Sequence, residues 1–417
     1  MCAELYKNRP EWADVTPVPQ DDGGRRIVKI AYSPQFVDAN DYMRAVLLKD
    51  ERSERALDVT STVLLLNPAN YTVWEYRRRI LESVSSDLKQ ELKFVSSLID
   101  EHPKNYQLWH HRQWLIRKLA GEQHGITSDP WALRELDFTA SVISDDSKNY
   151  HGWQYRRWVV NYFKMPVAGE LQYTKALITE DMYNNSAWNH RFVVVTRDEG
   201  LTPDVLKREI EFVQNSIRTA PNNESAWNYF YGLLVPAPTI TAGSQQRTNS
   251  PSSAGRSDAD HGDPSQDACQ KSPPVRLITL PPPVANLRLM RNFAEDLAAK
   301  DMVAADSSAL LGFLVEVYTD CLQVRIAQHT GGKNTEQPAA ETVDTQSKSV
   351  EPTGLVGEVR AEGEALASEE ESISDLLELA LSTCDRLATE VDRIRANYWR
   401  YRARQLTSLA SEAGLDS

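Results

Sequence analysis

Cysteine is scarce in this chain of 417 residues, and the four that occur lie far apart. Cys2, Cys269, Cys321 and Cys384 form no Cys-x-x-Cys pair, which excludes a disulfide framework and a zinc knuckle and is typical of a reducing compartment. The sequence also lacks any run of about 18 apolar residues, so we expect no membrane-spanning segment. Because the N-terminal stretch has no apolar signal core, we expect a cytoplasmic protein.

Positive charge is in short supply as well, with 46 Lys and Arg against 59 Asp and Glu and a net charge of −13. A nucleic-acid-binding protein would carry a basic domain or stripe, so this class is excluded. Residues 331–375 hold three basic and eleven acidic residues, whereas residues 1–240 hold 29 basic and 32 acidic ones. The net charge therefore mainly describes one short, solvated stretch and not the partners of the chain.

Tryptophan is abundant by contrast, and five of the ten tryptophans recur at intervals of 35, 44, 35 and 39 residues. The decamers around them align as NYTVWEYRRR, NYQLWHHRQW, NYHGWQYRRW, NNSAWNHRFV and NESAWNYFYG, which begin at residues 70, 105, 149, 184 and 223. In each decamer an Asn precedes the Trp by four residues, and in the first four an Arg follows it by three. Phe230 replaces this Arg in the fifth copy, and a partial sixth copy, NYWRYRAR, occupies residues 397–404.

Amphipathic segments with helical spacing separate these decamers, and each begins at a capping residue or a chain break. Asn is a good N-cap, so the Trp would lie one turn into a helix and the Arg would share its face. We expect this Arg to pair with acids or carbonyls of the neighbouring hairpin. One such helical hairpin cannot bury its apolar face alone. The repeat therefore predicts an all-α fold, a curved α-α superhelix of stacked helical hairpins with the tryptophans in its core.

Composition divides the chain into six parts. These are an N-terminal extension leading into the first helices (1–50), the five repeats (51–235), a Pro/Ser-rich insert (236–286), a helical hairpin (287–326), an acidic insert (327–372) and the C-terminal helices (373–417). Both inserts are poor in apolar residues, and we expect them to be disordered.

The repeated N-x-x-x-W-x-x-R unit resembles the repeat of prenyltransferase α subunits. Further stretches extend the likeness, namely RPEWADVTPVPQDDG from residue 9, DYMRAVLLKDERSERAL from residue 41, KNYQLWHHR at 104–112 and IRANYWRYRARQL near the C-terminus. Together they narrow the resemblance to the α-subunit family shared by protein farnesyltransferase and protein geranylgeranyltransferase type I.

This resemblance implies a right-handed, crescent-shaped solenoid of helical hairpins that wraps around a farnesyltransferase β subunit. If one α chain serves two enzymes, the chain would also wrap around the geranylgeranyltransferase type I β subunit. The β subunit would hold a catalytic Zn²⁺ that binds the substrate cysteine as thiolate, and Mg²⁺ is expected for the farnesyl enzyme. The sulfur attacks C1 of a prenyl diphosphate, and the substrates are CaaX-ending proteins such as Ras-type GTPases. The chain itself shows no His/Cys/Asp constellation for a metal and would be inactive alone.

Lys148 directly precedes the third decamer, and the resemblance places it in the active site against the diphosphate. Negative charge develops on the bridging oxygen as the C–O bond breaks, and a preplaced ammonium stabilises it. On its own, a lysine at a helix start is usually a solvated charge, although a positive helix N-terminus makes a structural role less natural. The resemblance therefore makes Lys148 the candidate catalytic residue.

Tyr150 and Tyr106 occupy the same position in adjacent repeats and should line one surface of the solenoid. The resemblance puts Tyr150 near the diphosphate and Tyr106 beside the last residue of the peptide substrate. His151 stands where the family often has Gln, and His can likewise donate to the carboxylate of the peptide. Asn184 is a further candidate contact. The alternatives are packing between hairpins for the tyrosines, a surface position for His151 and helix capping for Asn184.

Two other functions fit parts of the sequence. A non-enzymatic scaffold of the tetratricopeptide type would explain the solenoid, but not the flanking stretches or the Lys-Asn-Tyr at 148–150. The α subunit of the Rab geranylgeranyltransferase shares the repeat, but we would not expect the EWADVTPVPQ and DERSERAL stretches there. The preferred hypothesis is the α subunit of a heterodimeric CaaX protein prenyltransferase.

Overall fold

The computed structural model describes residues 4–21, 23, 30–84, 86–121, 129–197, 200–235, 282–331 and 371–413. Regular structure in these ranges consists of sixteen α-helices with a few short 3-10 and π turns, and they contain no strand. The predicted all-α class is therefore confirmed. The chain forms two compact units, Met1–Val194 and Val195–Ser417, which are described separately.

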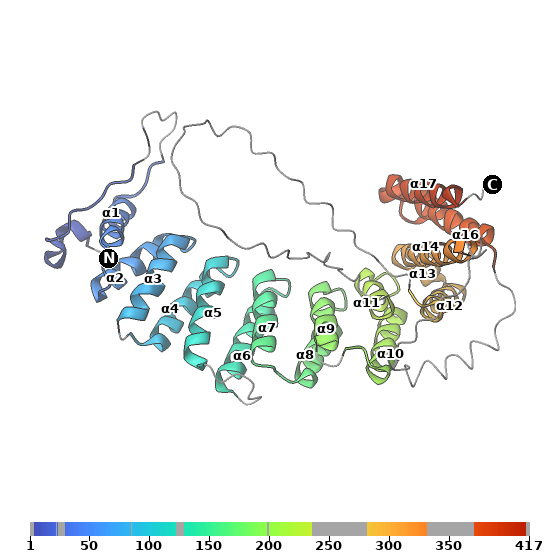
Figure 1. Cartoon of the computed structure of the whole chain (residues 1–417), viewed down its shortest axis with the longest axis horizontal. Helices are drawn as coiled ribbons and strands as arrows, with labels where there is room; N and C mark the ends of the chain where they lie inside the picture. The colour runs from blue at the N-terminus through green and yellow to red at the C-terminus, as the bar shows by residue number, and fades with distance from the viewer. Residues whose placement is uncertain are drawn as a thin grey trace, which may run out of the picture. The chain divides into compact units, whose positions relative to one another are not determined.

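The first unit is a row of helices that stand side by side (Figure 1). In chain order they are η1 (Tyr6–Asn8), η2 (Pro10–Trp12), α1 (Pro34–Leu48), α2 (Glu54–Leu66), α3 (Tyr71–Ser83), α4 (Leu88–Glu101), α5 (Tyr106–Ala120), α6 (Pro130–Asp145), α7 (Tyr150–Tyr162), α8 (Val167–Glu180) and α9 (Asn185–Arg197), the last of which runs past the boundary. Helix α4 packs on α5 and α6 on α7, while α5 also contacts both α3 and α7. These contacts are those of stacked helical hairpins.

Each helix that carries a repeat tryptophan begins just after an asparagine, as predicted. The Oδ1 atom of that asparagine accepts a hydrogen bond from a backbone N–H two or three residues further on, in Asn70, Asn105, Asn149, Asn184 and Asn223. This bond satisfies one of the N–H groups that a helix start leaves without an intrahelical partner.

The tryptophan one turn into each of these helices anchors the turn before it. Its indole N–H donates to the carbonyl six residues earlier at 2.7–2.9 Å, in the pairs Trp74–Pro68, Trp109–Pro103, Trp153–Ser147, Trp188–Met182 and Trp227–Pro221. All five tryptophans are buried, with at most 8% of their surface exposed. The bond satisfies the polar edge of a ring that otherwise packs in the core, which confirms the predicted core role.

The arginine three residues after the tryptophan joins three helices. Arg156 on α7 donates to Glu170 on α8 at 2.9 and 2.6 Å and to the Leu136 carbonyl on α6 at 2.9 Å. The next repeat completes the group, because His190 Nε2 lies 2.8 Å from the same Glu170 carboxylate. The arrangement recurs as Arg77–Glu91–His111 and Arg112–Glu135–Tyr155. We call these buried groups the Arg–Glu ladder; they confirm the predicted pairing of the arginines with acids and carbonyls of adjacent helices.

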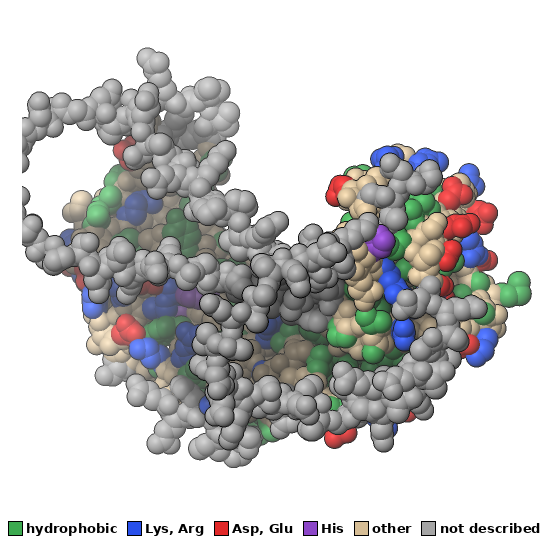
Figure 2. Space-filling view, turned by 45° about the vertical axis from the view of Figure 1, so that its right-hand side comes forward, with side chains coloured by type: hydrophobic (Ala, Val, Ile, Leu, Met, Phe, Trp, Pro, Cys, Tyr) green, Lys and Arg blue, Asp and Glu red, His purple; other side chains and the backbone are tan. Residues whose placement is uncertain are grey.

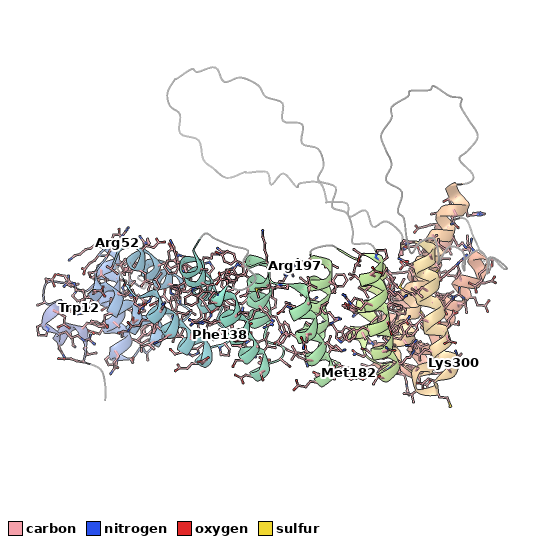
Figure 3. The ribbon with its side chains drawn as sticks, turned by 90° about the horizontal axis from the view of Figure 1, so that it is seen from below. Trp12, Arg52, Phe138, Met182, Arg197 and Lys300 are labelled. Carbon is pink, nitrogen blue, oxygen red and sulfur yellow. The ribbon has the colours of Figure 1, made fainter. Side chains whose placement is uncertain are left out.

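Side chains fill the spaces between neighbouring helices of the first unit (Figure 3). Phe138 on α6 is one of them, and its ring centroid lies 3.5 Å from the Arg112 guanidinium carbon and 5.9 Å from the Trp109 ring. The guanidinium is thus hydrogen-bonded by Glu135 in its plane and covered by an aromatic ring on its face, which is a favourable environment for a buried arginine.

The N-terminal segment packs on the first helices of the same unit. The Tyr6 and Trp12 rings lie 5.0 Å apart, and Trp12 meets Tyr42 of α1 edge-on at 5.4 Å. Arg55 of α2 donates to the two Asp14 carboxylate oxygens at 2.7 and 2.9 Å. Two of the stretches that carry the family resemblance, around residues 9–23 and 41–57, are therefore in direct contact.

The second unit continues with two helices of the repeat type and then a helical bundle. Its elements are α10 (Pro203–Thr219), α11 (Glu224–Leu234), α12 (Val284–Lys300), α13 (Met302–Ala305), α14 (Ser308–Gly331), α16 (Ile373–Arg386), η4 (Leu387–Val391), η5 (Arg393–Arg395) and α17 (Ala396–Glu412). Helix α14 packs against α11, α12, α16 and α17. Acidic and basic side chains are intermixed on the face of this unit that Figure 2 shows at the right.

Two boundaries differ from the predicted ones. Helix α12 begins at Val284 and α14 continues to Gly331, so helix extends a few residues into both predicted inserts. The remainder of the inserts, 236–281 and 332–370, lies outside the described residues. Helix α17 begins at Ala396, and the Trp399 indole donates to the Asp392 carboxylate at 2.8 Å instead of to a carbonyl. The partial sixth copy thus keeps the tryptophan but not the asparagine-capped turn.

None of the described helices is both long and apolar enough to cross a bilayer.

Candidate functional site

One four-residue turn, repeated with the same geometry, positions the candidate residues. Before α7 it runs from Asp146 to Asn149, whose N–H donates to the Asp146 carbonyl at 3.0 Å. Equivalent bonds of 3.2, 3.0 and 3.0 Å close the turns before α3, α5 and α9. Asn149 also reaches back to the preceding turn, where its Nδ2 donates to the Pro103 carbonyl at 3.3 Å. Successive turns are therefore held in register, and residues at equivalent positions form a row.

Lys148 is the third residue of its turn and is exposed to solvent. Its Nζ lies 3.9 Å from Asp181 Oδ2 on the next turn, and 63% of its side-chain surface is accessible. An exposed ion pair at this distance is weak. The ammonium is therefore free to approach a more highly charged anion, as the prediction for this residue requires.

Lys104 takes the equivalent place one repeat earlier, but it is held more closely. Its Nζ lies 3.1 Å from Asp146 Oδ2. The hydrogen bond from Lys104 and a backbone hydrogen bond from Lys148 hold the pKa of Asp146 below its ordinary value. Lys104 was not predicted as a site residue, although Lys-Asn-Tyr occurs both at 104–106 and at 148–150 and would have identified it.

Tyr106 and Tyr150 are the first residues of α5 and α7, and both rings are exposed, by 56% and 70% respectively. Such exposure argues against packing between hairpins as their role. The half-buried His151 ring contacts both, with centroid distances of 6.3 Å to Tyr106 and 5.5 Å to Tyr150. The structure therefore brings the two predicted tyrosines and His151 into one group across adjacent repeats.

Asn184, by contrast, is turned into the structure. Only 1% of its surface is exposed, and its Oδ1 caps α9 by accepting from the Ser186 and Ala187 N–H groups at 3.1 and 3.3 Å. Its Nδ2 donates to the Ser147 carbonyl of the preceding turn at 3.3 Å. These bonds favour the capping alternative, so we leave Asn184 out of the proposed ligand contacts.

The exposed residues Lys104, Tyr106, Lys148 and Tyr150, together with the half-buried His151, form what we call the KNY surface. They provide two ammonium groups, two phenols and an imidazole at the N-termini of α5 and α7, where helix dipoles add partial positive charge. The KNY surface can donate hydrogen bonds to an anion and stabilise its charge. It contains no nucleophile paired with a base, so a reaction here would need reacting groups from another chain.

The described part of the chain does not fit a catalytic zinc. It contains no group of three or more His, Cys, Asp and Glu side chains placed to hold a metal. Burial raises the pKa of both described thiols, Cys321 and Cys384, to about 11. Zinc binds the thiolate form, which such burial disfavours.

Comparison with known proteins agrees with the repeat. A model of the protein prenyltransferase alpha subunit repeat matches residues 53–84, 88–119, 132–163, 167–198 and 206–235. The farnesyltransferase/geranylgeranyltransferase type-1 subunit alpha of Dictyostelium discoideum is 39% identical over 240 residues, which are 55% of this chain and 70% of that protein. The chain belongs to this α-subunit family. The repeats of the family model are prenyltransferase repeats, which favours the preferred hypothesis over a tetratricopeptide-type scaffold.

Other members of the prenyltransferase α-subunit family match shorter segments. The subunit of Solanum lycopersicum is 53% identical over 96 residues, or 23% of this chain and 28% of the relative. The matched segments of the Arabidopsis thaliana and Pisum sativum subunits likewise cover only 28% and 26% of those proteins. The solved structure of Candida albicans protein geranylgeranyltransferase-I complexed with GGPP matches 94% of this chain and 97% of its own, with a TM-score of 0.61 and 23% identity. This last likeness supports the fold.

Proposed function

We propose that this chain is the α subunit of a heterodimeric CaaX protein prenyltransferase. The complex would transfer a farnesyl or geranylgeranyl group from the prenyl diphosphate to a cysteine near the C-terminus of its substrates. The observation that carries the proposal is the 39% identity to the Dictyostelium subunit over 70% of its length. The name of that relative favours this activity over transfer to Rab proteins, and the proposal places the complex in the cytoplasm.

Within the KNY surface, Lys148 and Tyr150 would serve the diphosphate end of this reaction, whereas Lys104 would stay paired with Asp146. The substrate sulfur forms a bond to C1 of the prenyl group, and the C1–O bond breaks with its electron pair on the diphosphate oxygen. Lys148 Nζ has only a 3.9 Å contact to Asp181, which a diphosphate would outcompete. The ammonium would then stabilise the negative charge that develops on the leaving oxygen, more in the transition state than in the ground state.

Tyr150 would add a phenolic hydrogen bond to the diphosphate, because it follows Lys148 by two residues and its ring is exposed. His151 and Tyr106 would contact the C-terminal end of the peptide, with His151 donating to its carboxylate. The His151 ring contacts both tyrosine rings, so these groups would reach diphosphate and peptide from one surface.

The proposal assigns the zinc to the partner subunit, because the described donor set of this chain does not fit it. Mg²⁺ in the farnesyl form would arrive bound to the diphosphate and not in a cage of this chain, since Mg²⁺ usually combines one or two carboxylates with substrate phosphates. It would offset diphosphate charge that Lys148 alone leaves uncompensated.

Co-expression with CaaX-type β subunits tests the proposal. We expect a stable one-to-one complex that prenylates peptides ending in Cys-a-a-Ser or Cys-a-a-Leu, according to the β subunit supplied. Failure to assemble with either β subunit, or a complex that modifies neither peptide, would overturn it. Activity with both β subunits would additionally assign one α chain to two enzymes.

A further inference from the structure

The carboxylate of Asp181 faces Lys148 from the next turn of the row. Asp181 opens the turn that ends at Asn184, whose N–H donates to the Asp181 carbonyl at 3.0 Å. In its side chain, Oδ1 accepts from the Tyr183 N–H at 3.0 Å, while Oδ2 lies 3.9 Å from Lys148 Nζ. One oxygen is thus anchored to the backbone and the other is directed at the ammonium. The fold therefore fixes the negative partner of this ion pair.

The same pairing occurs one repeat earlier, between Lys104 and Asp146. Here Nζ and Oδ2 lie 3.1 Å apart, and Asp146 Oδ1 accepts from the Lys148 N–H at 3.2 Å. In both pairs the lysine is third in its turn and the aspartate opens the turn that follows. The turn before α3 has Ala69 at the third position, and there His102 opens the following turn. In these turns lysine and aspartate occur together, which favours a joint role.

Lys148 differs from Lys104 in how its ammonium is held. A distance of 3.9 Å is too long for a hydrogen bond, and the side chains of Lys148 and Asp181 are 63% and 43% exposed. Such a pair orients the ammonium by charge and exchanges its partner easily. Asp146, the carboxylate on the other side, is already bonded to Lys104 and to the Lys148 backbone. The Lys148 ammonium is therefore drawn toward Asp181 but held there loosely.

We propose that Asp181 is a positioning residue that sets how tightly Lys148 holds the diphosphate, an inference that rests on the proposed function. Without ligand, Asp181 would keep the ammonium at the turn before α9. An incoming diphosphate would displace the carboxylate, and this exchange would subtract from the binding free energy. When the diphosphate product leaves, Asp181 would take the ammonium back. Asp181 would thus weaken the binding of substrate and product, and it would act through Lys148 and not on the reacting atoms.

The test uses the complete complex with a β subunit and measures the dissociation constant of inorganic diphosphate by isothermal titration calorimetry. Asp181→Asn removes the charge, while the amide oxygen can still accept from the Tyr183 N–H. Loss of an exposed ion pair that competes with the ligand predicts about threefold tighter binding. Asp87→Asn is the matched control, because Asp87 Oδ1 also accepts from a backbone N–H two residues on, but Asp87 forms no ion pair with the described residues. Unchanged binding in Asp181→Asn, or an equal gain in the control, would overturn the proposal.

A double-variant cycle separates action through Lys148 from a general effect of charge. In the Lys148→Ala background, Asp181→Asn should bring little further gain, because no ammonium is left to release. An equal gain in both backgrounds would contradict the assignment. In steady-state assays, Asp181→Asn should lower the KM for the prenyl diphosphate about threefold without raising kcat, since the ammonium has already left Asp181 in the substrate complex. A higher kcat with an unchanged KM would also contradict it.

A second variant keeps the test available if Asp181→Asn fails to fold. Asp181→Ser also removes the charge, and a serine hydroxyl can accept from the same backbone N–H. The outcomes separate this inference from the proposed function. A wild-type complex that transfers no prenyl group overturns the proposed function, whereas an active complex whose diphosphate affinity is the same with and without the Asp181 charge overturns only the role of Asp181.

Discussion

Single residues in this chain behave differently at equivalent positions of the repeat. Lys104 and Lys148 both occupy the third position of an asparagine-capped turn, but their Nζ atoms lie 3.1 and 3.9 Å from the nearest carboxylate oxygen. Asn184 and Asn149 both cap helices with Oδ1 and use Nδ2 to hold the preceding turn. The repeat therefore determines where a side chain lies, whereas its partners determine whether it is available to a ligand.

The buried group of Glu91, Arg77 and His111 makes folding sensitive to acid. Burial would raise the pKa of Glu91, but hydrogen bonds from His111 and Arg77 outweigh it and lower the pKa to about 2. Burial lowers the pKa of His111, although Glu91 opposes this. The His111 Nδ1 atom has no partner among the described residues, so the neutral ring, with Nε2–H donating to Glu91, suits the site best.

We predict that the free energy of unfolding falls as the pH falls through about 6.5, because the unfolded chain then takes up a proton at His111 that the folded chain does not. A second loss follows below about pH 4.5, when Glu91 protonates in the unfolded chain. Urea titrations of wild type and His111→Gln should show that the variant lacks a step on the order of 1 kcal/mol between pH 7 and pH 5. The control variant His102→Gln, at an exposed position, should still lose this unfolding free energy between pH 7 and pH 5. If His111→Gln loses it as well, the account is contradicted.

At the scale of elements, the asparagine-capped turn before α7 contributes to the stability of the fold and also positions Lys148. Asn149 caps α7 and bonds to the Pro103 carbonyl, while Trp153 one turn later bonds to the Ser147 carbonyl. These bonds fix both ends of the segment that carries Lys148. The asparagine cap and the tryptophan bond also occur at the turn before α3, where Ala69 stands in place of the lysine.

We predict that Asn149→Ala and Asn70→Ala each lower the unfolding free energy by about 0.5–2 kcal/mol, the usual cost of losing an N-cap. Only Asn149→Ala should also lower the kcat of the complex with a β subunit, because only its turn carries a lysine of the KNY surface. Urea unfolding and steady-state prenylation measure the two effects. Equal effects of both variants on kcat would show that the turn does not position Lys148.

At the scale of the whole molecule, much of the first unit follows from the sequence alone. The decamer repeat predicts the asparagine caps, the tryptophan core and the arginine pairs because each depends on local spacing. The acidic partners Glu91, Glu135 and Glu170 could not be predicted, since they follow their arginines by 14, 23 and 14 residues. The sequence indicates helix capping as the alternative role of Asn184, and the repetition of Lys-Asn-Tyr at 104–106 and 148–150 is enough to point to Lys104. The proposed contacts to diphosphate and peptide stay predictions for Lys148, Tyr150, His151 and Tyr106.

The Arg–Glu ladder should dominate the stability of the first unit. Arg156→Met leaves Glu170 buried without its guanidinium, and breaking a buried pair in this way costs about 3–5 kcal/mol. Urea unfolding should show this loss, and the double variant Arg156→Met/Glu170→Met should lose less than the sum of the single variants because no buried charge is left unpaired. Arg157→Met, at the exposed neighbouring position on α7, should change little. Strict additivity of the two ladder variants would contradict the pairing.

The central claim is that this chain supplies the cation that stabilises the leaving diphosphate in an enzyme completed by a β subunit. The most direct measurement compares the kcat for prenyl transfer of complexes that carry Lys148→Ala or Lys104→Ala. Removing one preorganised stabilising group typically costs about 10²–10³ in kcat, so we expect this loss for Lys148→Ala with assembly intact, and nearly full turnover for Lys104→Ala. Full turnover of an assembled Lys148→Ala complex, or an equal loss in both variants, would contradict the account.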